Sequence, residues 1–169
     1  PEAVSAVGRL AVRLGKTPVF VQNCPGFLVN RLLMPYLNEA VLMAEEGADF
    51  TKVDRLVKGF GMPMGPFTLL DEVGIDVGRE VATTLHGAYG ERMRTGRLFA
   101  LLAEAGEGGA AESTAARVAA PLLGKKNGHG FYLYAGAGGS DAAGSAGGGA
   151  GGEQRGPNPD MRRLLDQVR

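Results

Sequence analysis

The sequence predicts an all-α domain, a helical bundle preceded by one short helix and one β-strand. Three observations support this prediction. Apolar residues recur at three- and four-residue spacing through most of the chain, glycines and prolines separate these runs, and only one short run favours a strand. With 169 residues and a hydrophobic fraction of 44%, the chain can fill one core of ordinary size.

Residues 1–22 are typical of the last helix and strand of an α/β domain. Val4, Val7, Leu10 and Leu14 fall on one face of a helix over residues 2–14, and Gly15 ends it. The run TPVFVQ at residues 17–22 favours a β-strand. We therefore expect residues 1–22 to be a remnant of a domain that precedes the bundle.

The longest helix is predicted over residues 26–46, and Gly47 closes it. Its broad apolar face comprises Leu28, Leu32, Leu33, Tyr36, Leu37, Ala40, Val41 and Ala44. Thr51 and Asp54 have the spacing of a capping box, which predicts a short third helix that ends near residues 59–61.

Two prolines and a glycine predict a loop at residues 62–66. Pro66 suits the first position of the next helix, and Asp76 is predicted to cap the helix after that. Leu98, Leu101 and Leu102 mark a further helix. A last helical pattern at residues 115–123 is interrupted by proline.

The C-terminal part is predicted to leave the bundle, which then covers residues 23–134. Residues 135–152 contain nine glycines in eighteen positions, which indicates a flexible linker over residues 135–157. Asn158 and the two residues after it predict a helix start, and the apolar face that follows needs a partner. We expect residues 158–169 to begin another helical domain.

Composition excludes several classes of protein. The 18 basic and 18 acidic residues cancel, so the chain has no net field that would attract nucleic acid. No run of about 18 apolar residues occurs, so a membrane span is not expected. Cys24 is the single cysteine, which rules out an internal disulfide and favours a small buried side chain.

Three motifs stand in a fixed order along the chain. They are NCPGFLVNR at residues 23–31, GMPMGPF at residues 61–67 with LD and VGID shortly after, and GKKNGHGFY at residues 124–132. Together they resemble the C-terminal domain of the 3-hydroxyacyl-CoA dehydrogenases. Residues 47–50 and the glycine-rich linker are similar to the multifunctional α subunits of fatty-acid β-oxidation.

The resemblance implies a domain that works with an NAD-binding domain in front of it. That Rossmann-like domain would bind NAD and carry the catalytic His and Glu pair, so residues 1–22 would be its last helix and strand. The present chain would then not catalyse the reaction alone. The family's Asn that contacts the reacting oxygen matches Asn30. An amide suits this task because it donates a hydrogen bond without titrating.

Each candidate residue has a structural alternative. Asn30 would otherwise bond to backbone near a helix start. Arg31 is expected to pair with a carboxylate or to cap carbonyl groups. Met64 and Phe67 are the candidates for contact with the acyl chain, although their loop would equally serve only to turn the chain.

The remaining polar candidates are expected to be structural. His86 and His129 lack the cysteine or acidic neighbours of a metal site, so no metal is predicted. Lys125 and Lys126 would meet a CoA phosphate or form a solvated basic loop. Asp71 is expected to tie a loop.

The sequence thus predicts the substrate-side and pairing domain of an NAD-dependent (3S)-3-hydroxyacyl-CoA dehydrogenase. Expected partners are an acyl-CoA, a second copy of the domain in a homodimer and a thiolase subunit. The expected compartment is the bacterial cytoplasm, or the mitochondrial matrix or peroxisome in a eukaryote. The alternatives are a non-catalytic pairing module and the helical domain of another β-hydroxyacid dehydrogenase.

Overall fold

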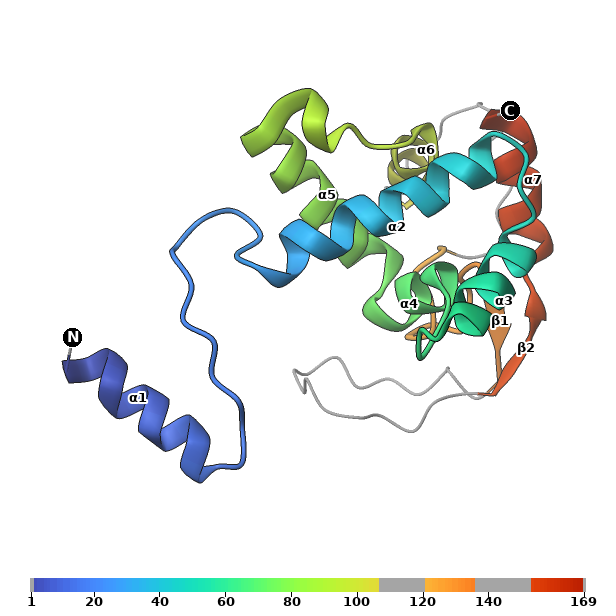
Figure 1. The fold of residues 1–169 in the computed structure, drawn as a ribbon. Helices are drawn as coiled ribbons and strands as arrows, with labels where there is room; N and C mark the ends of the chain where they lie inside the picture. The colour runs from blue at the N-terminus through green and yellow to red at the C-terminus, as the bar shows by residue number, and fades with distance from the viewer. Residues whose placement is uncertain (1, 107–120, 136–152, 169) are drawn as a thin grey trace.

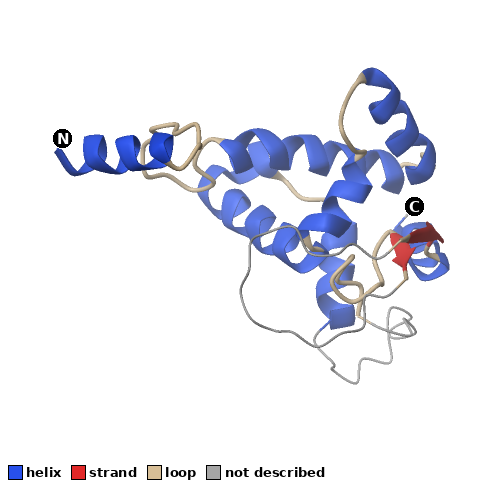
Figure 2. Cartoon of the chain, turned by 90° about the horizontal axis from the view of Figure 1, so that it is seen from below, coloured by secondary structure: helices blue, strands red, loops and turns tan. Residues whose placement is uncertain are grey.

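The structure is a computed structural model that describes residues 2–106, 121–135 and 153–168. Within these ranges the chain is mainly helical, with seven α-helices, one 3-10 helix and a two-stranded antiparallel sheet (Figure 1). The predicted all-α class is confirmed. Helices α2 to α7 and the sheet form one body, and α1 stands apart from it in two perpendicular views (Figures 1 and 2).

The N-terminal helix α1, Glu2–Arg13, is present as predicted, but the strand predicted at residues 17–22 is wrong. A strand requires a hydrogen-bonded neighbour. Within the described ranges the backbone of residues 17–22 forms no such bond. The Phe20 ring packs instead against Gly8 of α1, where an added Cβ would lie 2.6 Å from the ring.

Helix α2, Val29–Glu45, is the spine of the body. It contacts each helix from α3 to α7 (Figure 1). Its buried apolar residues recur on one face, and they are Met34, Leu37, Ala40, Val41 and Ala44. Helices α4, Pro66–Val73, and α5, Ile75–Tyr89, cross this face. The predicted long helix is confirmed with a later start.

The cap of α3, Phe50–Phe60, differs from the prediction. Its N-cap is Asp49, whose carboxylate accepts hydrogen bonds from the backbone N–H groups of Thr51 and Lys52. The capping box that we expected from Thr51 and Asp54 is therefore wrong. Asp54 is buried and accepts its hydrogen bonds from a different element.

Two other helix starts were only partly predicted. Pro66 occupies the first turn of α4 as expected, but no side chain caps α5, and Asp76 lies within its first turn. The 3-10 helix η1, Gly90–Met93, leads to α6, Arg97–Gly106. Glu45 at the end of α2 accepts from the Leu98 N–H at 2.7 Å, so this side chain caps the start of α6.

The C-terminal segment returns to the same core, contrary to prediction. Strand β2, Gln154–Pro157, pairs antiparallel with β1, Tyr132–Tyr134, so part of the predicted linker is a strand. Helix α7, Pro159–Val168, packs against α2 and α6. Its apolar face, which we expected to remain uncovered, is buried and comprises Met161, Leu164, Leu165 and Val168.

Two further predictions concern residues outside the described ranges. Residues 136–152 of the predicted linker and residues 115–120 of the predicted helix are not described, and residues 121–123 are not helical. Among the described helices, none combines the length and the apolar character that crossing a membrane requires.

Candidate functional site

The segment before α2 turns sharply so that the helix can begin. The Cys24 carbonyl accepts from the Phe27 N–H at 3.0 Å, and Gly26 has a φ of +74°. Phe27 also has a positive φ, +46°, which is costly for a residue with a side chain. This turn fixes where α2 starts and therefore where its first residues point.

Asn30 lies in the first turn of α2 and is half-buried. Its position continues the buried stripe of Met34, Leu37 and Val41 towards the start of the helix. Within the described ranges no hydrogen bond to its side chain is formed, so the bonding to nearby backbone that we considered as an alternative is absent. The amide retains its full capacity to bind a polar atom.

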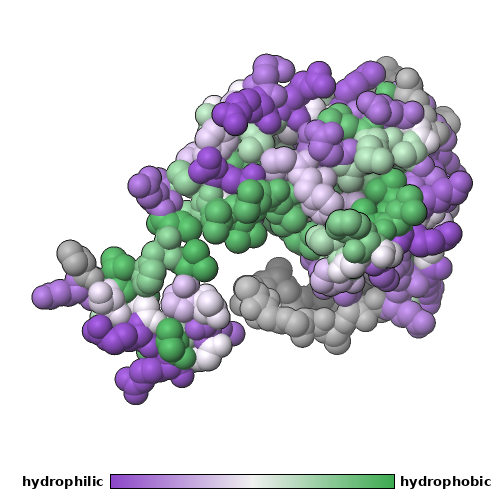
Figure 3. All heavy atoms as spheres, viewed as in Figure 1, coloured by the Kyte–Doolittle hydropathy of each residue, from purple (hydrophilic) through white to green (hydrophobic). Residues whose placement is uncertain are grey.

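Exposed apolar side chains surround the start of α2. Phe27, Leu28, Val29 and Leu32 are 44–69% exposed. Figure 3 shows hydrophobic surface along the side of this helix that faces α1. A patch of this kind is typical of a surface that binds another protein or a ligand. Asn30 therefore lies at the border between the core and an uncovered apolar surface.

Arg31 forms contacts other than those predicted. Its guanidinium lies over the Tyr89 ring, 5.1 Å from the centroid, and its Nη1 is 3.7 Å from the Cys24 sulfur. The Tyr89 hydroxyl donates to the Pro25 carbonyl at 3.2 Å. Arg31 thus holds the turn against the end of α5 by a cation–π contact, and the expected carboxylate partner is wrong. Cys24 is only half-buried.

A surface hollow of about 540 Å³ lies beside this contact. Its lining is mostly apolar with two guanidinium groups, and it consists of Phe27, Leu28, Arg31, Leu32, Pro35, Tyr89, Arg92 and Met93. Asn30 does not line it. The hollow shares Phe27, Leu28 and Leu32 with the uncovered apolar surface.

The two residues predicted to contact an acyl chain have different environments. Met64 is half-buried in the loop before α4. Phe67 is fully buried, with its ring centroid 4.7 Å from Phe131 and 5.7 Å from Phe50. Phe67 belongs to the aromatic core and has no surface for an acyl chain, so only Met64 remains a candidate.

Asp54 fixes the loop between α3 and α4 and was not identified from sequence. Its carboxylate accepts from the Phe67 N–H at 2.9 Å, from both donors of Thr68, and from the Tyr132 hydroxyl at 2.9 Å. A Cβ at Gly65 would overlap this aspartate, which explains the glycine in the loop. The sequence did not indicate this role of Asp54, because its hydrogen-bond partners lie 13 or more residues away along the chain.

Asp71 anchors the third motif to α4, as the predicted loop-tying role requires. Its carboxylate is completely buried and accepts from the backbone N–H groups of Phe131 and Tyr132 and from the Tyr134 hydroxyl, at 2.8–3.0 Å. Burial raises the pKa of Asp71 to about 7, although these three donors favour the charged form. Burial and the neighbouring carboxylates also raise the pKa values of both tyrosines.

The other polar candidates are structural in this arrangement. Lys125 pairs with Glu72 at 2.6 Å, and Lys126 pairs with Asp76, so both lysines tie the third motif to the α4–α5 region. His86 is exposed and His129 half-buried. Across the described residues, no group of three potential metal ligands occurs.

Comparisons with known proteins agree with this arrangement. The family model described as 3-hydroxyacyl-CoA dehydrogenase, C-terminal domain, matches residues 26–134. Three solved structures are also similar. The first is (S)-3-hydroxybutyryl-CoA dehydrogenase from Ralstonia eutropha, which is 34% identical with a TM-score of 0.64, over 78% of this chain and 42% of that chain.

The second similar structure is FadB2 of M. tuberculosis, which is 34% identical with a TM-score of 0.64, over 79% of this chain and 42% of that chain. The third is 3-hydroxybutyryl-CoA dehydrogenase from Escherichia coli K12, which is 31% identical with a TM-score of 0.63, over 78% of this chain and 26% of that chain. The present chain thus spans less than half the length of each of these proteins.

Proposed function

The chain belongs to the family of 3-hydroxyacyl-CoA dehydrogenase C-terminal domains, and we propose that it is the substrate-side domain of an NAD-dependent (3S)-3-hydroxyacyl-CoA dehydrogenase. The oxidation removes a hydride from C3 and a proton from the 3-hydroxyl group. The residues that would accept them, and NAD itself, are expected on another domain. The described residues include no strand followed by a glycine-rich turn and helix, so they do not fit a dinucleotide.

The side chain that carries this proposal is Asn30. Its amide is half-buried, makes no hydrogen bond within the described residues, and lies at the edge of an uncovered apolar surface. An N–H donor fixed there would donate a hydrogen bond to the 3-oxygen of the substrate. This hydrogen bond would become stronger as the 3-hydroxyl group loses its proton and negative charge develops on the oxygen. The helix start is held by Arg31 and Tyr89, so the donor is positioned before substrate arrives.

The uncovered apolar surface supports the second part of the proposal, which is that other domains pack here. Phe27, Leu28, Val29 and Leu32 would be covered by the NAD-binding domain or by a second copy of this domain. The acyl-CoA would then lie between the domains, with Asn30 at one wall and Met64 a candidate contact. The setting in fatty-acid β-oxidation, the homodimer, the thiolase partner and the cytoplasmic location remain proposals from resemblance.

A domain exchange tests the function. The segment of the Ralstonia eutropha dehydrogenase that this chain matches is replaced by this chain. Reduction of acetoacetyl-CoA is then followed through the absorbance of NADH. We expect activity with the exchanged protein and none with the Ralstonia remainder alone. A folded exchanged protein that binds NADH but does not reduce acetoacetyl-CoA would support the non-catalytic alternative.

A titration tests the substrate surface independently of catalysis. The side-chain amide signals of Asn30 and Asn38 are followed by NMR while acetoacetyl-CoA is added to the chain. Asn38 is the matched control because its amide is already used, by the Arg94 carbonyl and the Gly96 N–H. We expect the Asn30 signals to shift and those of Asn38 to remain unchanged. Movement of both, or of neither at millimolar ligand, would contradict the proposed contact.

A further inference from the structure

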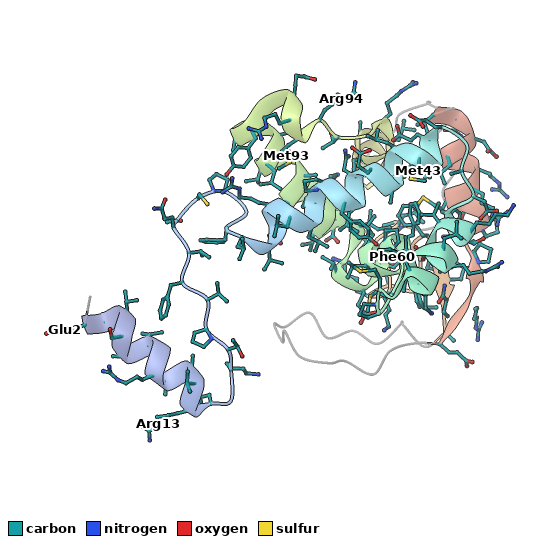
Figure 4. The ribbon with its side chains drawn as sticks, viewed as in Figure 1. Glu2, Arg13, Met43, Phe60, Met93 and Arg94 are labelled. Carbon is teal, nitrogen blue, oxygen red and sulfur yellow. The ribbon has the colours of Figure 1, made fainter. Side chains whose placement is uncertain are left out.

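The outward face of α3 combines exposed apolar and basic side chains. Phe60 is 89% exposed, and Leu56, one turn earlier, is 74% exposed (Phe60 is labelled in Figure 4). Met62 follows directly after the helix and is 39% exposed. We call these three residues the α3 tip. None of these three residues has been assigned a role in the candidate functional site. Phe60 is among the most exposed large apolar residues within the described ranges.

The surroundings of the α3 tip are open. A Cβ added at Gly59 or at Gly61 would meet nothing within 4 Å. Gly61 has a φ of +117° and ends the helix, so Phe60 is the last helical residue. The apolar side chains therefore stand on a projecting helix end, with open space at the glycines on either side of Phe60.

The exposed charges that α3 itself carries all have one sign. Lys52 lies one turn before Leu56 on the same side of α3, and Arg55 and Lys58 are exposed on the adjacent side of the helix. None of the three forms an ion pair within the described ranges. The only acidic residue of α3 is Asp54, and it faces the core and is hydrogen-bonded there. The exposed part of α3 therefore presents one positive charge in line with the apolar side chains and two more on its neighbouring side.

We propose that the α3 tip binds the surface of an anionic lipid bilayer. Apolar side chains flanked by lysine and arginine are the composition of interfacial helices, in which the apolar residues enter the headgroup region and the basic residues meet acidic lipids. A fluid surface accepts a projecting phenylalanine without a preformed pocket. An acidic protein would need a complementary hollow, so the exposed geometry favours lipid. This inference does not depend on the proposed dehydrogenase function.

Vesicle sedimentation of the full chain tests the proposal. The chain is mixed with vesicles of phosphatidylcholine alone or with 30% phosphatidylglycerol, at low salt and at high salt. We expect sedimentation with the anionic vesicles only, and release at high salt because the charges are exposed. Phe60→Ser should weaken binding about tenfold. Lys58→Gln should weaken it about fivefold, the effect of one basic residue near such a surface.

Two variants of α1 serve as matched controls, because this helix also carries exposed apolar and basic residues. Leu10 is 53% exposed and Arg13 is exposed (Arg13 is labelled in Figure 4). Leu10→Ser and Arg13→Gln should leave vesicle binding unchanged. Binding that falls with the α1 variants but not with Phe60→Ser would overturn the proposal. So would the absence of binding to anionic vesicles, or equal binding to both vesicle types.

Discussion

Removal of the Asp54 carboxylate should be among the most destabilising single changes in this domain. The side chain joins α3 to the start of the next helix, α4, and to strand β1 near the other end of the domain. Asp54→Ala would leave the N–H groups of Phe67 and Thr68 and the hydroxyls of Thr68 and Tyr132 without their acceptor. Asp54 is 4% exposed, so water cannot replace the carboxylate without opening the loop.

The expected loss follows from the number of abandoned donors. Each buried donor that loses its partner costs roughly 1–3 kcal/mol, and part of this is recovered when the loop relaxes. The two buried donors, of Phe67 and Tyr132, and the two partly buried donors of Thr68 therefore predict a loss of about 4 kcal/mol in the free energy of unfolding. Asp54→Asn keeps one acceptor oxygen but directs an NH2 group at the other donors, so a loss of about 2–3 kcal/mol is expected.

The assay is urea denaturation followed by circular dichroism at 222 nm, with Glu72→Gln as the control. Glu72 forms a partly exposed ion pair with Lys125, and its neutralisation should change the free energy of unfolding by less than about 1 kcal/mol. If Asp54→Ala loses no more stability than Glu72→Gln, then the carboxylate does not hold the loop and the account of the GMPMGPF motif fails.

Three further predictions concern the same fold. Gly65→Ala should destabilise the domain by about 2–4 kcal/mol, because its Cβ would overlap the buried carboxylate of Asp54. Gly59→Ala should stabilise the domain by up to about 1 kcal/mol, because this helical position has open space for a Cβ. Urea denaturation of the two variants distinguishes these outcomes. Leu165→Ala should cost about 2–4 kcal/mol, and Val12→Ala, 61% exposed, should cost almost nothing; equal losses would mean that α7 is not part of the core. The raised pKa of Asp71 means that the folded state holds its proton more tightly than the unfolded state, so stability should fall as pH rises from about 4 through about 7. Asp71→Asn should flatten this slope in denaturation series between pH 5 and pH 8, and an unchanged slope would exclude Asp71 as its source.

The sequence was sufficient to predict most of the helices because local signals agree with the final packing. The apolar face of α2 and the proline at the start of α4 are examples. The predicted strand at residues 17–22 is wrong because a strand depends on a hydrogen-bonded neighbour, which local sequence cannot reveal.

Long-range hydrogen bonds account for the other differences. Asp54 looked like part of a helix cap, but its partners lie 13 or more residues away. Asn158 donates to the Gly130 carbonyl across the glycine-rich segment and starts α7 on the core, so a helix that seemed to begin a new domain completes this one. Phe67 looked available to a ligand because its motif is a loop, yet it is fully buried and the rings of Phe50 and Phe131 pack against it.

The proposed role of Asn30 rests partly on sequence and partly on structure. Its residue type and motif made it a candidate, and the sequence alone left the backbone-bonding alternative open. The structure shows no such bond within the described residues, and it places Asn30, half-buried, in the first turn of α2.

The turnover number of the exchanged dehydrogenase with Asn30→Ala is the most direct test of the proposed role of this amide. Asn38→Ala is measured beside it, because Asn38 holds the start of α6 and its loss should lower the melting temperature rather than the rate. We expect Asn30→Ala to lower kcat about 100-fold or more with little change in melting temperature. Turnover equal to that of the unmodified exchanged enzyme would contradict the account.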